Sequence, residues 1–197
     1  MRCSQSARRS CTVTKLAGLN LAVTTVLLLI AQAVFAEPMC GSDQFATGAG
    51  RFEDNADGTV TDTRSHLMWM RCSRGQQWID KRCAGQALRL SWQAAKEFAE
   101  DVNQQGQMFY NDWRVPKVSE LATIAELQCA SPRINVSVFP DTVPSWYWTA
   151  SLRPNSAGEA LALSFGTEGV GHDDLTQSAL VRLVRSAQGF RESRAGR

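Results

Sequence analysis

The chain of 197 residues carries 21 basic and 19 acidic side chains, a formal net charge of +2. Its Lys and Arg residues form no run interleaved with aromatic side chains, which excludes the usual pattern of a nucleic-acid-binding surface. Four basic residues precede residue 37, so residues 37–197 keep 17 of the 21 basic side chains and all 19 acidic ones, a net charge of −2. A segment of that length is expected to fold as one domain around a single core.

The first 36 residues have the pattern of a signal peptide. The basic residues come first: Arg2, Arg8, Arg9 and Lys15. An apolar stretch of about eleven residues follows at 21–31, which is typical of a signal peptide and short for a membrane span. Val34 and Ala36 are the small residues that signal peptidase requires, so we expect export and cleavage before Glu37. An uncleaved anchor is the alternative, because the stretch 16–36 could cross a bilayer.

Four cysteines remain after cleavage: Cys40, Cys72, Cys83 and Cys129. An even number in an exported chain indicates two disulfides, for which three pairings are possible. Cys72 and Cys83 are close enough in sequence to close a short loop, which leaves Cys40 with Cys129. A zinc site is the alternative, but no Cys-x-x-Cys pair is present and His66 is the only nearby imidazole. We therefore expect neither a metal nor a cofactor.

The predicted elements begin after a small, polar leader at residues 37–50. Residues 51–63 contain Asp57-Gly58 between two short segments, which predicts a β-hairpin. Residues 67–71 are an apolar run typical of a core strand, and the stretch 72–83 is expected to be a polar loop carrying Trp78.

The hairpin segment is also compared with a calcium-binding loop, because five of its residues have oxygen-bearing side chains: Asp54, Asn55, Asp57, Thr59 and Asp62. When the stretch is aligned on Gly58, the first ligand position of an EF-hand holds Glu53 and the twelfth holds Arg64 in place of Glu. A hairpin with an Asp-Gly turn explains the same residues without an ion. The calcium interpretation stays open as the alternative.

Two helices are expected in the middle of the chain. Ser91 is a good N-cap and Gly106 a good end for the first, and one of its faces is an apolar stripe of Trp92, Ala95, Phe98, Ala99 and Val102. In the stretch YNDWRVPKVSELATIAELQC (110–129), Pro116 favours an extended segment at 113–115. A second helix is expected over 118–128, with Glu120 in its first turn. In this interpretation Trp113 packs against a helix and Arg114 pairs with a carboxylate or a carbonyl.

The last third of the chain predicts three strands, at 146–151, 160–165 and 179–186, separated by irregular loops. His172 lies between the second and third beside Asp173 and Asp174, where it is either in a polar surface loop or one arm of a metal or acid–base site. A frayed, polar tail is expected at 187–197. Two helices with strands before and after them indicate an α+β fold.

Aromatic and basic residues of these strands are the candidate ligand-binding and structural groups. Trp146 and Trp148 should share one strand face and Tyr147 the other. An exposed pair of indoles would be a sugar-stacking surface, whereas burial in the core is the more common arrangement. Arg182 and Arg185, three residues apart, cannot share a strand face, so at least one should be exposed or ion-paired, and neither is a convincing catalytic group.

Several of these stretches resemble, in order, a known family. DWRVPKVSEL is similar to the DWRLP-x-x-x-EL signature of the C-terminal domain family of the Legionella collagen-like protein. The likeness continues through RFEDNADGTVTDTRSHLMW, SWQAAKEFA, PRINVSVFPDT, SWYWTAS and LVRLVRS, and it spans residues 51–186. The residues that carry it are Trp113, Arg114, Pro116, Glu120, Arg182 and Arg185.

The resemblance implies a single domain with a fold distantly similar to C-type lectins and formylglycine-generating enzymes: two helices on short, twisted antiparallel strands with long loops. It also implies an exported protein, often on bacterial surfaces, with adhesion or glycan binding. Two residues depart from the family pattern. Lys117 stands where a Thr or Asn would cap the second helix, and His66 stands where a turn Gly is usual.

Three functions follow from these observations, in order of preference. The first is a non-catalytic binding domain, periplasmic or on the cell surface, that recognises a glycan or a protein through Trp146, Trp148, Tyr147 or Trp78. The second is a structural or assembly component of an envelope machine. The third is an enzyme of the formylglycine-generating type, although that chemistry uses paired cysteines late in the chain and no cysteine follows Cys129.

Overall fold

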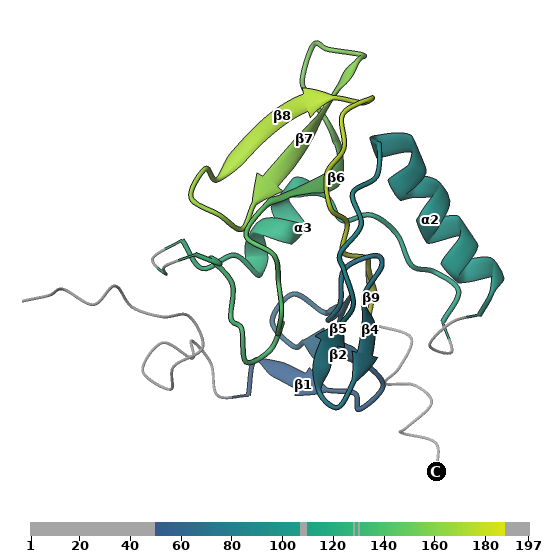
Figure 1. Cartoon of the computed structure of the whole chain (residues 1–197), viewed down its shortest axis with the longest axis vertical. Coiled ribbons are helices and arrows are strands. Elements are labelled where there is room, and N and C mark those ends of the chain that lie inside the picture. Colours follow the sequence, from purple (N-terminus) through teal and green to yellow (C-terminus); the bar gives the residue numbers. More distant parts are fainter. Residues whose placement is uncertain (1–49, 107–109, 128, 130, 188–197) are drawn as a thin grey trace, which may run out of the picture. The chain divides into compact units, whose positions relative to one another are not determined.

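A computed structural model describes residues 50–106, 110–127, 129 and 131–187, which form nine strands and two helices (Figure 1). The predicted signal peptide, all but the last residue of the predicted leader, and the tail beyond residue 187 lie outside these residues. Neither described helix is long and apolar enough to cross a membrane.

The first sheet has four antiparallel strands in the order β1-β2-β3-β9: β1 (Phe52–Asp54), β2 (Thr59–Asp62), β3 (Leu67–Met70) and β9 (Val184–Ser186). The predicted hairpin is confirmed, with Gly58 at φ +88° in its turn. All four residues of β3 are buried, as expected for a core strand. His66 has a φ of +54° in the turn that precedes β3, a region where glycine is favoured.

A disulfide-closed hairpin follows the first sheet. Its strands are β4 (Gln77–Ile79) and β5 (Arg82–Ala84), and the Cys72–Cys83 disulfide is confirmed. The prediction of a polar loop over 72–83 was therefore wrong in its second half. Asp80 and Lys81 form the two-residue turn with φ values of +51° and +62°, a conformation that an Asn-Gly pair would have signalled. Cys40 lies outside the described residues, so its pairing with Cys129 stays a prediction.

The first predicted helix is confirmed as α2 (Trp92–Gln104). The hydroxyl of Ser91 accepts the N–H of Ala94 at 3.3 Å, which is the expected N-cap, and Gly106 follows the helix with a φ of +60°. The buried face holds the small and branched residues of the predicted stripe: Ala95, Ala99 and Val102.

The second helix, α3 (Val118–Thr123), is shorter than the predicted 118–128. Beyond Ile124 the chain turns back, so that Ala125 pairs with Ile134 and the N–H of Glu126 donates to the carbonyl of Arg133 at 2.9 Å. The N–H of Glu126 thus bonds to the returning chain instead of to a carbonyl of the helix, which ends the helix early. Leu127 is left 65 % exposed.

The second sheet has the antiparallel order β6-β7-β8, with β6 (Trp146–Leu152), β7 (Glu159–Ser164) and β8 (Val170–Asp174). The strand β8 contains His172, so the prediction of a loop there was wrong. Periodicity could not have revealed it, because β8 is an edge strand with no buried residue and hence no apolar face.

The segment 179–183 joins the two sheets. Its prediction as one strand over 179–186 was correct only for β9. Upstream of β9, Leu180 donates its N–H to Trp146 at 3.0 Å and accepts the N–H of Trp148 at 2.9 Å, which ties the segment to β6. The carbonyl of Leu183 accepts the N–H of Met70 at 3.1 Å, which ties it to β3. The segment therefore hydrogen-bonds first to the second sheet, at β6, and then to the first sheet, at β3.

Two hydrophobic clusters form the core, and β6 contributes to both. Trp148, with half-buried Trp146, belongs to the cluster that includes the inner face of α2, and Tyr147 belongs to the cluster that includes Leu121 of α3. This confirms that the two indoles share one strand face and the phenol lies on the other. Helices combined with mostly antiparallel strands confirm the α+β class.

Candidate functional site

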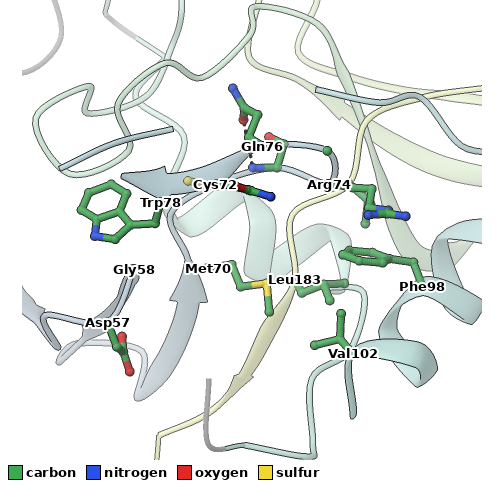
Figure 2. Close-up of a pocket in the computed structure, with 14 residues that line it drawn as sticks. Asp57, Gly58, Met70, Cys72, Arg74, Gln76, Trp78, Phe98, Val102 and Leu183 are labelled. Carbon is green, nitrogen blue, oxygen red and sulfur yellow. Dashed lines mark hydrogen bonds between the residues drawn. The ribbon is translucent and has the colours of Figure 1, made fainter. Parts of the chain in front are cut away.

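A recess of about 380 Å³ lies between the β1–β2 turn, the disulfide-closed hairpin, α2 and the segment 181–183. We call it the Trp78 recess. Its lining includes the side chains of Asp57, Met70, Arg74, Trp78, Phe98 and Leu183. Figure 2 shows Trp78 and Asp57 on one side, Phe98 and Arg74 on the other, and Met70 and Leu183 between them. The recess therefore has an apolar floor between two walls that each pair an aromatic ring with a charged group.

Trp78 is positioned by the hairpin and by a neighbouring cation. It lies on β4 opposite Cys83, so the disulfide closes the loop that carries it. The guanidinium of Arg71 lies 4.9 Å from the centre of the indole and also pairs with Asp54 at 3.2 Å. Trp78 remains only half-buried, so part of its indole is available to a ligand.

Arg74 forms the opposite wall with Phe98. Its guanidinium lies 4.7 Å from the centre of the Phe98 ring, and its backbone N–H donates to Val181 at 3.1 Å. The next residue, Gly75, has a φ of +92°, and a Cβ there would collide with the carbonyl of Gln86. Arg74 forms no ion pair with any described residue. Arg74 is thus an exposed cation that contacts an aromatic ring and has no acidic partner among the described residues.

Asp57 contributes a carboxylate to the wall beside Trp78. One of its oxygens accepts the N–H of Thr59 at 2.9 Å and the hydroxyl of the same residue at 2.5 Å. Asp54 similarly accepts the N–H of Ala56 at 2.9 Å. Within the described part of the chain, no group of three His, Cys, Asp or Glu side chains is arranged to hold a metal ion. The carboxylates of the calcium-like stretch that this structure describes are engaged by the hairpin itself.

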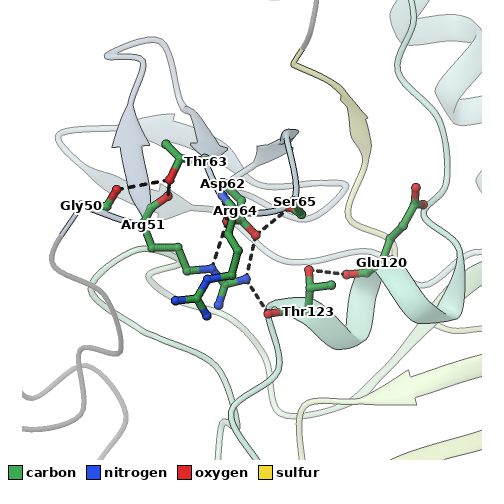
Figure 3. Close-up of polar contacts among 8 residues, drawn as sticks. All are labelled: Gly50, Arg51, Asp62, Thr63, Arg64, Ser65, Glu120 and Thr123. Carbon is green, nitrogen blue, oxygen red and sulfur yellow. Dashed lines mark hydrogen bonds and ion pairs between the residues drawn. The ribbon is translucent and has the colours of Figure 1, made fainter.

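Asp62, the last of those carboxylates, anchors the hairpin to α3 (Figure 3). Arg51 donates to both of its oxygens, at 3.0 and 2.7 Å, and also to the carbonyl of Thr123 at 2.7 Å. Burial by itself raises the pKa of the Asp62 carboxyl, but hydrogen bonds from Arg51, Ser65 and the backbone of Arg64 outweigh it and hold that pKa below its ordinary value.

Arg182 supports the recess from within the core. The side chain is 1 % exposed and donates to the carbonyls of Met70, at 3.1 Å, and Arg71, and to the hydroxyl of Thr142 at 2.8 Å. Its guanidinium also lies 4.9 Å from the centre of the Phe139 ring, and burial lowers its pKa. Because Met70 ends β3 and lines the recess, Arg182 holds the backbone from which one edge of the recess is built.

Arg185 is held by a different kind of partner. Its Nε donates to Asp112 at 2.5 Å, and its guanidinium lies 4.0 Å from the centre of the Tyr110 ring. This confirms that at least one of the two arginines is ion-paired. The three-residue spacing between Arg182 and Arg185 could not predict that Arg182 is buried without a carboxylate partner among the described residues.

The stretch around Trp113 has the structural part that its sequence predicted. Trp113 is buried against α2, where the amide of Asn103 donates to its carbonyl at 2.9 Å and accepts its N–H at 2.8 Å. Arg114 donates to both carboxylate oxygens of Glu120 at 2.7 Å, which confirms a carboxylate partner. Glu120 also accepts the backbone N–H of Lys117 at 2.7 Å, whereas the Lys117 side chain makes no capping hydrogen bond. The carbonyl of Pro116 accepts the N–H of Ala150 at 2.7 Å.

The three aromatic residues of β6 do not form an exposed platform; burial in the core, the more common arrangement, is found for Trp148 and Tyr147. Trp148 is 1 % exposed and donates its indole N–H to the carbonyl of Leu90 at 2.8 Å, and Tyr147 is fully buried. Both are needed to fill the core, which leaves only Trp146 half-buried. Trp146 covers Gly171 and lines a second recess, of about 150 Å³, which we call the Trp146 recess.

His172 lines the Trp146 recess and joins a cluster of charged side chains. Arg153 donates to Glu159 at 2.6 Å, and Nδ1 of His172 lies 3.8 Å from the same carboxylate. The cluster is largely exposed, so it is a surface network rather than an enclosed acid–base site. The other histidine, His66, accepts the N–H of Ala187 at 2.9 Å through its carbonyl.

Of the four aromatic candidates from the sequence, Trp78 is the one that lines the larger recess. Its partners Arg74, Phe98 and Asp57 were missed as a site. The sequence pattern places Phe98 on a core face of a helix, and Asp57 in a turn or, alternatively, a calcium-binding loop. No sequence signal distinguishes Arg74, because its lack of an ion-pair partner among the described residues is a property of the three-dimensional arrangement.

In the comparison with family models, the Lcl C-terminal domain matches residues 58–185. The matched range contains the Trp113–Glu120 stretch and nearly all of the described strands and helices. No curated protein matches the chain.

Proposed function

The chain belongs to the Lcl C-terminal domain family, and on that premise we propose that it is an exported, non-catalytic binding domain of the bacterial envelope or surface. Its ligand is a glycan or a protein partner, bound in the Trp78 recess. The observation that carries the proposal is the recess itself. A half-buried indole, an exposed cation beside an aromatic ring and a carboxylate surround an apolar floor in a space of about 380 Å³, within the size range of ligand sites.

The chemistry of the lining supports binding rather than catalysis. Of the described residues that line the recess, Asp57 is the one carboxylate, none is a histidine, and Cys72 is held in a disulfide. General acid–base catalysis ordinarily uses two titratable groups within reach of the reacting atoms. Nucleophilic catalysis needs an activated side chain, and Ser73, which also lines the recess, is buried with its hydroxyl 3.3 Å from that of Tyr147.

Export and fold are further parts of the proposal. The signal-peptide pattern of residues 1–36 supports export, and so does the Cys72–Cys83 disulfide, because disulfides persist in oxidising compartments. A C-type-lectin-like fold is what the family resemblance implies. Two helices packed on short antiparallel strands with long connections support it.

The test is a binding screen of the oxidised chain against a glycan array and against proteins of an envelope extract. Trp78→Ala removes the indole of the proposed site, and Trp146→Ala is the matched control, since each deletes one half-buried indole from one recess. We expect binding to be lost in Trp78→Ala and kept in Trp146→Ala. The far-ultraviolet circular dichroism spectrum, which reports secondary structure, should be unchanged in both variants.

Binding that survives Trp78→Ala would place the ligand elsewhere. Copper-dependent oxygen consumption with a cysteine-containing peptide would contradict the non-catalytic part of the proposal.

A further inference from the structure

We propose that the Trp78 recess binds the free carboxyl terminus of a protein partner whose last residue is apolar. The inference rests on the proposed function, because it names the ligand class of the same recess. It follows from the charges at the two walls and from the chemistry of the floor between them.

The wall at Arg74 is suited to a carboxylate. Arg74 has no ion-pair partner among the described residues, whereas nearby Arg71 is already paired with Asp54. The guanidinium of Arg74 lies against the Phe98 ring, and the backbone hydrogen bond to Val181 fixes the main chain from which this exposed side chain extends. A planar guanidinium binds a carboxylate through two parallel N–H donors, so a terminal carboxylate is a geometric as well as an electrostatic match.

The opposite wall accepts hydrogen bonds. One oxygen of Asp57 is used by Thr59, and Asp57 forms no ion pair with a described residue. A carboxylate offers about four acceptor sites in total, so capacity remains for the backbone N–H groups of a peptide. Asp57 and Arg74 lie on opposite sides of Met70 in Figure 2. A peptide that directs its N–H groups to one and its terminus to the other would satisfy both charges.

The floor discriminates a peptide from a sugar. Met70, Val102 and Leu183 offer no hydrogen-bonding side chain, and Phe98 and Trp78 stand on either side of them, although the lining of the recess also includes the polar residues Ser73, Gln76 and Gln77. Transfer of an apolar side chain from water to this floor lowers the free energy. A sugar hydroxyl placed there would lose its water without a partner, at a cost of about 1–3 kcal/mol. The floor therefore favours an aliphatic or aromatic last residue.

The experiment uses fluorescein-labelled hexapeptides and the oxidised chain, with fluorescence anisotropy as the readout. Three peptides share their first five residues, Gly-Ser-Gly-Ser-Gly. One ends in Phe with a free carboxylate, one in Phe amide, and one in Ser with a free carboxylate. We expect the first to bind, and both amidation and the change to Ser to raise the Kd at least tenfold. In Arg74→Gln the first peptide should bind as weakly as its amide.

Arg153→Gln is the control, because it removes an exposed arginine beside the other recess and should leave all three Kd values unchanged. Equal binding of the acid and the amide, or an unchanged Kd in Arg74→Gln, would overturn the inference. So would a glycan that binds the wild-type chain but not Trp78→Ala, although that result would leave the proposed function standing. If Trp78→Ala changes binding of no peptide, glycan or envelope protein, the inference and the proposed function both fail.

Discussion

The Trp78 recess and the Trp146 recess each contain one half-buried indole, but they are built from different elements. The Trp146 recess lies on the three-stranded sheet, where Glu159 contacts Arg153 and His172, and its lining also contains Arg89 and Asp173, which form no ion pair with a described residue. The Trp78 recess is built from turns and a disulfide-closed hairpin, where Arg74 and Asp57 form no ion pair with a described residue.

The two recesses position their charged groups by different means. Neighbouring strands bring opposite charges to short range, as Glu159 of β7 and His172 of β8 are, although Asp173 of β8 forms no ion pair with a described residue. Loops held at fixed points can leave a charged group without a partner. In this chain the fixed points are the disulfide, the buried Arg182 and the backbone of Gly75.

The largest effect expected from this comparison is at Arg182. In Arg182→Met the carbonyls of Met70 and Arg71 lose their buried donor with little change in side-chain volume, so the free energy of unfolding should fall by about 3 kcal/mol. The exposed counterpart, Arg153→Met, should cost less than about 0.5 kcal/mol. Urea denaturation measures both. An Arg182→Met variant as stable as wild type would mean that the cost of burying the charge outweighs its hydrogen bonds.

The next effect is that of the Cys72–Cys83 disulfide. Closing a loop of 11 residues is worth about 3 kcal/mol in the chain-entropy model, so the double variant Cys72→Ser, Cys83→Ser should lose that amount. The loss should be accompanied by weaker ligand binding at Trp78. Tryptophan resonances of the Trp146 recess, followed by NMR, should stay where they are in the wild type. Movement of both sets would show that the two recesses are not independent.

A pair of glycine substitutions sharpens the comparison at smaller cost. In Gly75→Ala the new Cβ meets the Gln86 carbonyl at a positive φ, so about 2 kcal/mol of stability should be lost. In Gly171→Ala the Cβ meets the edge of the half-buried Trp146 ring, which can move, and the loss should be below about 1 kcal/mol. Thermal unfolding ranks the stabilities of the two variants. If Gly171→Ala lost more stability than Gly75→Ala, the Trp146 recess would be the more rigid of the two.

The smallest effect is confined to acid. The pKa of the Asp62 carboxyl is held below its ordinary value, so its stabilisation is present above the pKa of the unfolded chain, about 3.9, and is lost as the pH falls through the folded pKa. Asp62→Asn should therefore be less stable than wild type at neutral pH and lose less stability between pH 5 and about pH 2.

Glu159→Gln is the control for this pH dependence. A hydrogen bond from Arg153 lowers the pKa of Glu159, but that pair is on the surface, where ion pairs contribute little to stability. The stability of Glu159→Gln should follow the wild-type pH curve. Unfolding in urea at a series of pH values gives the free energy of unfolding of the three chains as a function of pH. If the curve of Asp62→Asn runs parallel to that of the wild type, Asp62 does not cause the loss of stability in acid.

Local interactions made a large part of the fold predictable. The Asp57-Gly58 turn, the Ser91 cap and the short loop between Cys72 and Cys83 each depend on residues close in sequence, and the structure confirms all three. The same reasoning predicted that Trp146 and Trp148 share a face, because alternation along a strand needs only adjacent residues. For the site, it singled out Trp78 as a ligand-binding residue, and Asp57 only as part of a calcium-like hairpin.

The remaining features depend on partners that are distant in the sequence. α3 ends at Thr123 because the chain beyond it returns to pair with Ala125, and β8 is a strand only because β7 lies beside it. Arg182 is buried because it reaches the carbonyl of Met70, 112 residues away. The sequence by itself therefore determined the Asp57-Gly58 turn, the Ser91 cap, the closed loop and the family. Tertiary structure decided which charges are paired, and so where a ligand could bind, because pairing depends on distance in space between residues that the chain order does not bring together.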